Sequence, residues 1–166
     1  MIASIFTTER ALPLTIKSCT LRGNHVIANR FMKKGELRIP IDSGELIPVE
    51  EMDDSYYALQ ISETHFIGTK EPDFEDATCF LNHSCNPNLA FENGEPVLVN
   101  RVDIHPGDEL TWDYSTSIDD GNFAMTCHCK SDRCRGTITS FGELPEAERK
   151  RLLPLALAFI QKRYQN

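Results

Sequence analysis

Short runs in which apolar and polar residues alternate dominate the first two thirds of the chain. Residues 14–18 and 37–41 alternate in this way, and a longer run rich in apolar residues occupies 24–32. Alternation with a period of two is typical of strands that bury one face. Turn-forming residues interrupt the runs at 33–36 and 42–45. Short strands with frequent turns predict a mainly β domain.

The middle of the chain continues this pattern. Five further strands are predicted, at residues 46–49, 56–61, 65–68, 89–91 and 96–101. The second and third of these form a hairpin, and the last two are joined by a turn at 92–94. The period is ambiguous at 74–81, where a short helix is expected. A turn at 105–108 leads into one more strand at 109–112.

The last third of the chain differs in character. Residues 115–121 are small, polar and acidic, and they predict a linker. Residues 144–151 predict a helix, which Pro154 kinks or restarts because proline removes a backbone donor. Apolar residues then recur at helical spacing, which predicts one face packed on the body of the protein or, alternatively, a dimer contact; they are Leu153, Leu157, Ile160 and Tyr164.

Composition limits the class of protein. With 166 residues, 40% hydrophobic and 25% charged, the chain suits one soluble domain with a small appendage. No apolar run approaches the roughly 20 residues that span a bilayer, and the first ten residues lack a secretion signal. We therefore expect an intracellular protein, cytoplasmic or nuclear, without a membrane partner.

The net charge is −8, from 25 acidic and 17 basic residues. This excess argues against direct nucleic-acid binding, which depends on clustered lysine and arginine. It suits a basic partner such as a lysine-rich peptide, which the charge would steer, although the same charge could serve solubility alone.

Six cysteines in an intracellular chain indicate metal ligands or buried thiols rather than disulfides. Cys127, Cys129 and Cys134 lie within eight residues, one thiolate short of the four that structural zinc usually takes. The earlier cysteines are candidates for the fourth ligand, and reduced structural thiols are the alternative reading.

The densest polar motif is Asn-His-Ser-Cys-Asn-Pro-Asn at residues 82–88, which follows an apolar run. So many hydrogen-bonding groups are costly to bury without partners. Two later motifs accompany it, Gly-Asp-Glu-Leu-Thr-Trp-Asp-Tyr at 107–114 and Cys-His-Cys-Lys-Ser-Asp-Arg-Cys-Arg-Gly at 127–136. In this order the three motifs resemble the SET-domain methyltransferases that carry a post-SET zinc-binding tail.

The resemblance implies a β-clip-like SET fold: small curved sheets, a pseudoknot that threads residues 82–88 beneath a loop, short helices and a C-terminal helix. It implies a SET domain at 14–118, a post-SET zinc tail at 119–138 and a C-terminal helical extension at 139–166. It covers most of the chain.

The resemblance also implies two bound groups, S-adenosyl-L-methionine and a structural Zn2+. The zinc ligands would be Cys127, Cys129 and Cys134, with Cys85 as the fourth. The residues implied in cofactor binding are Gly23, Asn24, His25, Asn82, His83, Tyr114 and His128. His25 stands where the family has a second glycine, so it either meets the cofactor through its imidazole or is only a surface strand residue. His128 either stacks on the adenine or lies exposed.

Tyr114 matches the active-site tyrosine of the family, where an uncharged phenol orients methyl transfer. Trp112 replaces a smaller aromatic residue and should narrow the channel for the accepting group. Asp42 stands where the family has a second tyrosine. As a carboxylate it would attract a lysine ammonium, or act as a general base if burial raised its pKa, or be a solvated turn residue. In the last case the second wall of the channel would be Tyr56 or Tyr57.

The leading function is S-adenosylmethionine-dependent methylation of a lysine in a protein or peptide, by a monomer or homodimer. Two alternatives remain at this point. One is O-methylation of a small-molecule carboxylate or alcohol on the same scaffold, and the other is a non-catalytic zinc-bearing interaction module.

Overall fold

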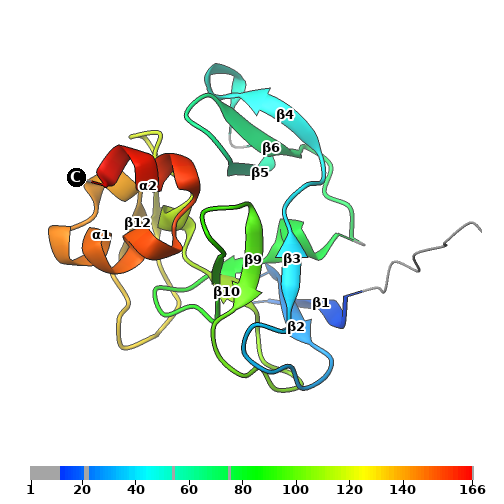
Figure 1. Cartoon of the computed structure of the whole chain (residues 1–166). Helices are drawn as coiled ribbons and strands as arrows, with labels where there is room; N and C mark the ends of the chain where they lie inside the picture. The colour runs from blue at the N-terminus through cyan, green and yellow to red at the C-terminus, as the bar shows by residue number, and fades with distance from the viewer. Residues whose placement is uncertain (1–11, 21–22, 54, 75, 166) are drawn as a thin grey trace, which may run out of the picture.

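The computed structural model describes residues 12–20, 23–53, 55–74 and 76–165. Within them the strands form small, separate sheets (Figure 1). Two sheets have three strands, in the orders β3-β9-β8 and β4-β6-β5; three have two strands, β1-β2, β7-β10 and β11-β12. All pairs are antiparallel except β7 with β10, which are parallel.

The elements follow the chain in a simple order. The strands are β1 (Leu14–Cys19), β2 (Gly23–Ala28), β3 (Arg38–Pro40), β4 (Glu45–Pro48), β5 (Tyr57–Gln60), β6 (His65–Thr69), β7 (Asn82–His83), β8 (Leu89–Phe91), β9 (Val97–Asn100), β10 (Thr111–Trp112), β11 (Ala124–Thr126) and β12 (Thr137–Thr139). The 3₁₀ turns are η1 (Val49–Glu51), η2 (Ala77–Phe80), η3 (Tyr114–Thr116), η4 (Phe141–Glu143) and η5 (Leu153–Leu155), and the α-helices are α1 (Glu146–Leu152) and α2 (Ala158–Tyr164).

The prediction of a mainly β fold is confirmed, and the predicted strands lie close to their expected positions. In β2, for example, Val26 and Ala28 are buried and Ile27 between them is half-buried. The predicted hairpin is the antiparallel pair β5–β6, in which Leu59 opposes Ile67. The ambiguous stretch before residue 82 forms the short turn η2.

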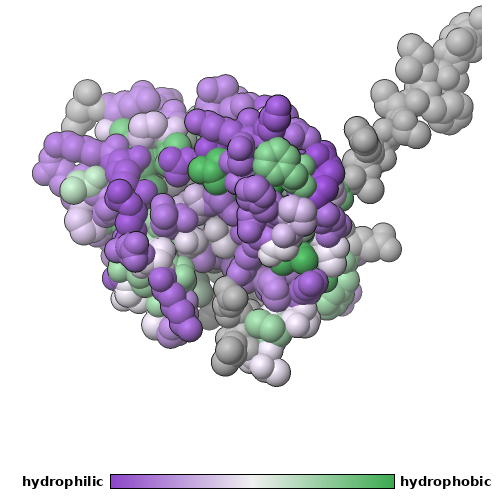
Figure 2. Space-filling view, turned by 90° about the horizontal axis from the view of Figure 1, so that it is seen from below, coloured by the Kyte–Doolittle hydropathy of each residue, from purple (hydrophilic) through white to green (hydrophobic). Residues whose placement is uncertain are grey.

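The main hydrophobic core lies where the sheets meet. Side chains from β2, β3, β8, β9 and β10 form its centre, including Val26, Ile39, Leu89, Leu98 and Trp112. In Figure 1 the C-terminal helices lie at one end of the molecule, and the sheet of β4, β5 and β6 lies apart from the strands at the centre. On the face shown in Figure 2, hydrophobic residues are scattered among hydrophilic ones, as expected for a chain with a net charge of −8.

The sequence predicts a kink or a restart of the C-terminal helix at Pro154, and the structure shows the restart. Helix α1 ends at Leu152, the turn η5 contains Pro154, and α2 begins only at Ala158. The apolar stripe nevertheless packs on the protein, since Leu157 and Ile160 are 2% and 0% exposed. Among the described residues, the helices are too short and too polar to cross a membrane.

The prediction of a linker at residues 115–121 is wrong. Ser115, Thr116, Ser117 and Ile118 are all buried. Small hydroxyl side chains tolerate burial when local carbonyls accept their hydrogen bonds. Here Thr116 Oγ1 donates to Asp113 O over 2.6 Å, and Ser115 Oγ donates to Thr139 O over 2.7 Å. The segment therefore belongs to the core that surrounds the site.

Candidate active site

Residues 109–112, which include β10, contact the segment 82–88 at both of its ends. At its start, Asn82 pairs with Thr111 and His83 with Trp112 in the parallel ladder. At its end, Asn88 Nδ2 donates to Glu109 O over 2.8 Å, and its Oδ1 accepts from Thr111 N over 2.9 Å. Asn88 thus replaces missing ladder bonds with its side chain, and this fixes the segment beside residues 109–112.

Tyr114 lies two residues after the end of β10 and is the first residue of η3. Its hydroxyl donates to Leu81 O over 2.8 Å, and its backbone N–H donates to His83 Nδ1 over 3.2 Å. Its ring lies 4.7 Å from that of Trp112, measured between centroids. Burial raises the pKa of the Tyr114 phenol above its usual value of 10. Tyr114 is therefore a fixed, neutral phenol.

Both ring nitrogens of His83 contact other atoms of the protein. Because Nδ1 accepts from Tyr114 N, the neutral ring carries its proton on Nε2, which lies 3.2 Å from Cys85 Sγ. Burial lowers the pKa of His83 to about 4, although the Asp113 carboxylate acts in the opposite direction. The imidazole is thus neutral at physiological pH and joins Tyr114 to Cys85.

A cavity of about 1040 Å³ lies on one side of Tyr114. All three residues predicted to act in catalysis line it, namely Asp42, Trp112 and Tyr114. Its lining also contains Asp73, Asp76 and Glu71, so four carboxylates line the cavity with no lysine, arginine or histidine among the described lining residues. Tyr57 and Phe74, 47% and 66% exposed, are aromatic members of the wall.

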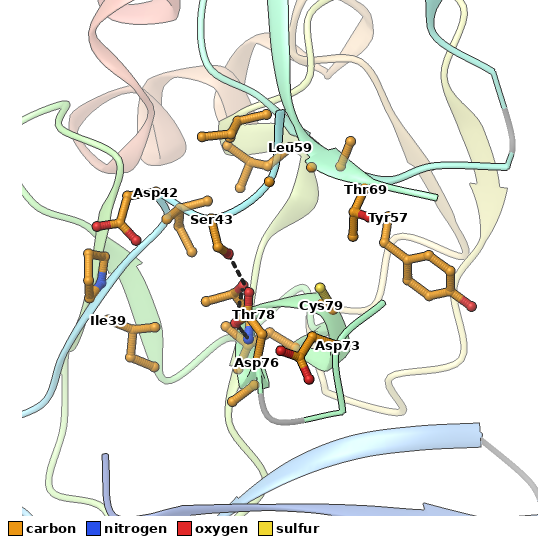
Figure 3. Close-up of a pocket in the computed structure, with 18 of the residues that line it drawn as sticks. Ile39, Asp42, Ser43, Tyr57, Leu59, Thr69, Asp73, Asp76, Thr78 and Cys79 are labelled. Atoms are coloured by element: carbon orange, nitrogen blue, oxygen red, sulfur yellow. Dashed lines mark hydrogen bonds between the residues drawn. The ribbon is translucent and has the colours of Figure 1, made fainter. Parts of the chain in front are cut away.

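The carboxylates of the cavity do not all serve the same purpose. Figure 3 shows a hydrogen bond from Ser43 to Asp76, which also accepts from Thr78 N over 2.8 Å. Asp76 therefore fixes the turn before η2. Asp42 is exposed and lies on the other side of the Ser43–Asp76 bond from Asp73 in this view (Figure 3). An exposed carboxylate suits the attraction of a cation.

Apart from Tyr114, the residues expected to bind the cofactor are not part of the lining of this cavity. Asn82 Nδ2 donates to Asn24 O over 3.3 Å and to Glu109 Oε1 over 3.0 Å, which joins β2, β7 and the residues just before β10. His25 is half-buried, and its Nδ1 lies 3.4 Å from Gly23 O. Glu109 lies in the second motif, but nothing in the sequence marks it as a partner of Asn82.

Four cysteines come together in the structure next to Tyr114. The sulfurs of Cys85, Cys127, Cys129 and Cys134 all lie within 4.8 Å of one another, and the first two are 3.7 Å apart. Tetrahedral zinc with Zn–S bonds of about 2.3 Å would separate its sulfurs by about 3.8 Å. The donor set and its spacing therefore fit zinc. His128, within the same loop, is exposed.

Sequence comparison identifies the family. The SET domain model matches residues 23–115, which is more than half of the chain. The protein therefore belongs to the SET domain family. The match ends before Cys127, so the post-SET assignment of the tail and the three domain boundaries remain predictions.

Several relatives and structures resemble the chain. Histone-lysine N-methyltransferase ash1 of Drosophila melanogaster is 38% identical over 65 residues, 36% of this chain and 3% of that protein. Human Histone-lysine N-methyltransferase 2D is 30% identical over 98 residues, 52% of this chain and 2% of that protein. The chain thus spans a small fraction of these relatives.

Two solved structures share the fold at 21% identity. One is KRYPTONITE in complex with mCHG DNA and SAH, with a TM-score of 0.61 over 76% of this chain and 29% of that one. The other is the methyltransferase domain of human Histone-lysine N-methyltransferase SETMAR, with a TM-score of 0.58 over 76% of this chain and 58% of that one. This likeness confirms the expected fold.

Proposed function

We propose that this protein is an S-adenosylmethionine-dependent protein-lysine N-methyltransferase. The observation that carries the proposal is the cavity beside Tyr114, which combines carboxylates and aromatic rings and has no basic described residue in its lining. Such a cavity favours a cationic acceptor such as a lysine side chain. Membership of the SET family supports the reaction class.

The protein's own groups suit methyl transfer. When bound, S-adenosylmethionine supplies a methyl group activated on a sulfonium. Tyr114 is held at both its hydroxyl and its backbone N–H, so it presents an uncharged polar wall of fixed geometry. Trp112, packed on Tyr114, narrows the cavity next to it. The residues that would hold the cofactor are Gly23, Asn24, His25, Asn82, His83, Tyr114 and His128.

Asp42 would draw the lysine toward the cavity. It is exposed and lines the same cavity as Tyr114, which suits long-range attraction of an ammonium group. The same charge would repel a small-molecule carboxylate, so the O-methylation alternative for carboxylic acids loses support. The organised Tyr114 site gives no support to a purely non-catalytic module.

Zinc would have a structural role in this proposal. The four-cysteine cluster would fasten the tail at residues 119–138 to Cys85, which lies within the central motif. Because Cys85 is in contact with His83, which accepts a hydrogen bond from Tyr114 N, the metal would also fix the segment 82–88 beside Tyr114.

A radiolabelled-methyl assay tests the proposal. The protein is incubated with tritiated S-adenosylmethionine and a mixture of lysine-containing peptides, and with a cell lysate separated into protein and small-molecule fractions. Label on lysine in the peptide or protein fraction is expected. Label confined to the small-molecule fraction, or no transfer with either mixture, would contradict the proposal.

Asp42→Asn refines the test of acceptor charge. We expect the KM for a lysine peptide to rise several-fold at low salt and less at high salt, because salt screens exposed charges. Glu50→Gln is the control, since Glu50 is exposed but does not line the cavity. An unchanged KM in Asp42→Asn would show that Asp42 takes no part in recognising the acceptor.

A further inference from the structure

A buried ion pair connects Arg135, in the cysteine-rich tail, to Asp113, which lies between β10 and Tyr114. Arg135, next to Cys134, donates from Nη1 to Asp113 Oδ2 over 2.6 Å and from Nη2 to Asp113 Oδ1 over 2.7 Å. The two side chains are only 10% and 1% exposed. A bidentate pair of this kind fixes the orientation as well as the distance of its partners.

Asp113 lies immediately before Tyr114 and determines how the chain enters η3. Its carboxylate caps this turn by accepting from Ser115 N over 3.2 Å. Arg135 Nη2 also lies 3.2 Å from Ser115 Oγ. The residues on both sides of Tyr114 are thus in contact with one guanidinium group.

The other side of Arg135 faces the four-cysteine cluster. Its backbone N–H donates to Cys85 Sγ over 3.4 Å. Its Nε is buried and has no hydrogen-bond partner among the described residues, so the guanidinium is positioned for Asp113 at the expense of one unsatisfied donor. A buried donor without a partner lowers stability. A role of Arg135 in positioning Asp113 would explain why this cost is tolerated.

We infer that Arg135 is a positioning residue that transmits the order of the cysteine tail to Tyr114 and Trp112 through Asp113. Its effect on catalysis rests on the proposed function, whereas its effect on the geometry of the site does not. His83, between Cys85 and Tyr114, provides a second and uncharged connection, so the test must separate the two.

Trp112 reports on this connection without any need for methyl transfer. It is the single tryptophan of the chain, it is 7% exposed, and its ring packs on Tyr114. In the wild-type protein purified with zinc, removal of the metal by EDTA should shift the tryptophan emission to the red. In Arg135→Gln the shift should be less than half as large. A shift of more than half the wild-type value, or none in the wild type, would overturn the inference.

Arg163→Gln is the matched control. Arg163, in α2, makes an equally short contact, 2.6 Å to Asp119. It therefore joins the segment 115–121 to α2, but it does not contact Asp113. Its EDTA response should equal that of the wild type. An equal reduction in both variants would show that Arg135 acts only on general stability, which contradicts the inference.

A double variant covers the case in which Arg135→Gln fails to fold or to retain zinc. Asp113→Asn with Arg135→Gln removes both charges, so no unpaired buried charge remains. Zinc content by metal analysis should stay at one per chain, and the EDTA response should remain below half of the wild-type value. A full response in this variant would overturn the inference.

Kinetics extend the test once an acceptor peptide is known. In the double variant, kcat should fall at least tenfold while KM for the peptide changes less than threefold, the pattern of a lost transition-state interaction. Arg163→Gln should leave both unchanged. A wild-type kcat in the double variant contradicts the inference, whereas a failure of the wild type to transfer methyl groups contradicts only the proposed function.

Discussion

At the scale of single residues, Tyr114 is held at two points. Its hydroxyl hydrogen is donated to Leu81 O, and its backbone hydrogen to His83 Nδ1. A phenol that donates one bond still has lone pairs that accept another. Tyr114 can therefore accept a hydrogen bond from an incoming amine while its own position stays fixed.

Tyr114→Phe should lower kcat by about 100-fold, the order of magnitude that a positioned polar group contributes in a transition state. The dissociation constant for S-adenosylmethionine should change less than threefold. Steady-state kinetics and titration calorimetry measure the two quantities. A loss of cofactor affinity as large as the loss of turnover would show that Tyr114 mainly binds the cofactor.

The raised pKa of Tyr114 also has a consequence for stability. Above about pH 10 the unfolded chain loses this phenolic proton while the folded protein keeps it, so the unfolded state binds fewer protons. The free energy of unfolding should therefore fall as pH rises through 10, by up to about 1.4 kcal/mol per pH unit from this group. Urea unfolding between pH 9 and 11 should show a shallower fall in Tyr114→Phe. Parallel curves for the two proteins would contradict this expectation.

At the scale of elements, the sheet of β4, β5 and β6 brings backbone atoms very close together at two glycines, Gly44 and Gly68. A Cβ atom on Gly68 would lie 2.2 Å from the backbone oxygen of Tyr57. Gly44, at the turn into β4, would meet Gly68 O at 2.3 Å in the same way. Backbones this close leave no room for a side chain at either glycine, and both glycines line the cavity.

Gly68→Ala should destabilise the fold by about 3 kcal/mol, since the clash is with backbone and forces the strands apart. Gly142→Ala is a matched control without positive φ, in which the new Cβ would meet the Tyr164 hydroxyl at 2.3 Å. A side-chain end can move, so its cost should be about 1 kcal/mol. Urea unfolding compares the two. Equal costs would mean that the strands can separate at Gly68 without loss.

The sequence predicts most of the longer strands because their alternation reflects burial on one face. It predicts β10, within the strand expected at 109–112, but not β7, because a two-residue strand has no period. Nor does it predict their pairing, which joins segments far apart in the chain. The motifs identify Tyr114, Asn82 and the four cysteines. They do not identify the partners of these residues, because Glu109, Asp113 and Arg135 acquire their contacts only when distant segments pack together.

At the scale of the whole molecule, the described residues form three hydrophobic clusters. The largest joins the sheets, the second joins η4 to the C-terminal helices, and the third contains Cys85, Cys127 and Ile138 beside Tyr114. The third has few members and depends on the cysteine cluster. We therefore expect the tail to order with the metal and the β sheets to fold without it.

Cys129→Ser should abolish zinc binding and methyl transfer while leaving most of the β-sheet circular dichroism intact. Metal analysis, activity and circular dichroism measure the three. Cys19→Ser is the control, because Cys19 is exposed at the end of β1 and lies outside the four-cysteine cluster. Freshly purified wild-type protein without zinc, or Cys129→Ser with a full complement, would contradict the proposed site.

The long span of the contacts around Cys85 also affects how the protein emerges from the ribosome. Cys127 follows Cys85 by 42 residues, and Arg151, which donates to Cys85 O, follows it by 66. The strand that flanks residues 82–88 is likewise made after them. When residues 82–88 have just been synthesised, β10, Cys127 and Arg151 do not yet exist. These polar residues therefore cannot reach their folded arrangement until the later segments have been made. The first sheets can form before residues 127–151 are made, whereas the candidate site around Tyr114 is completed only after them.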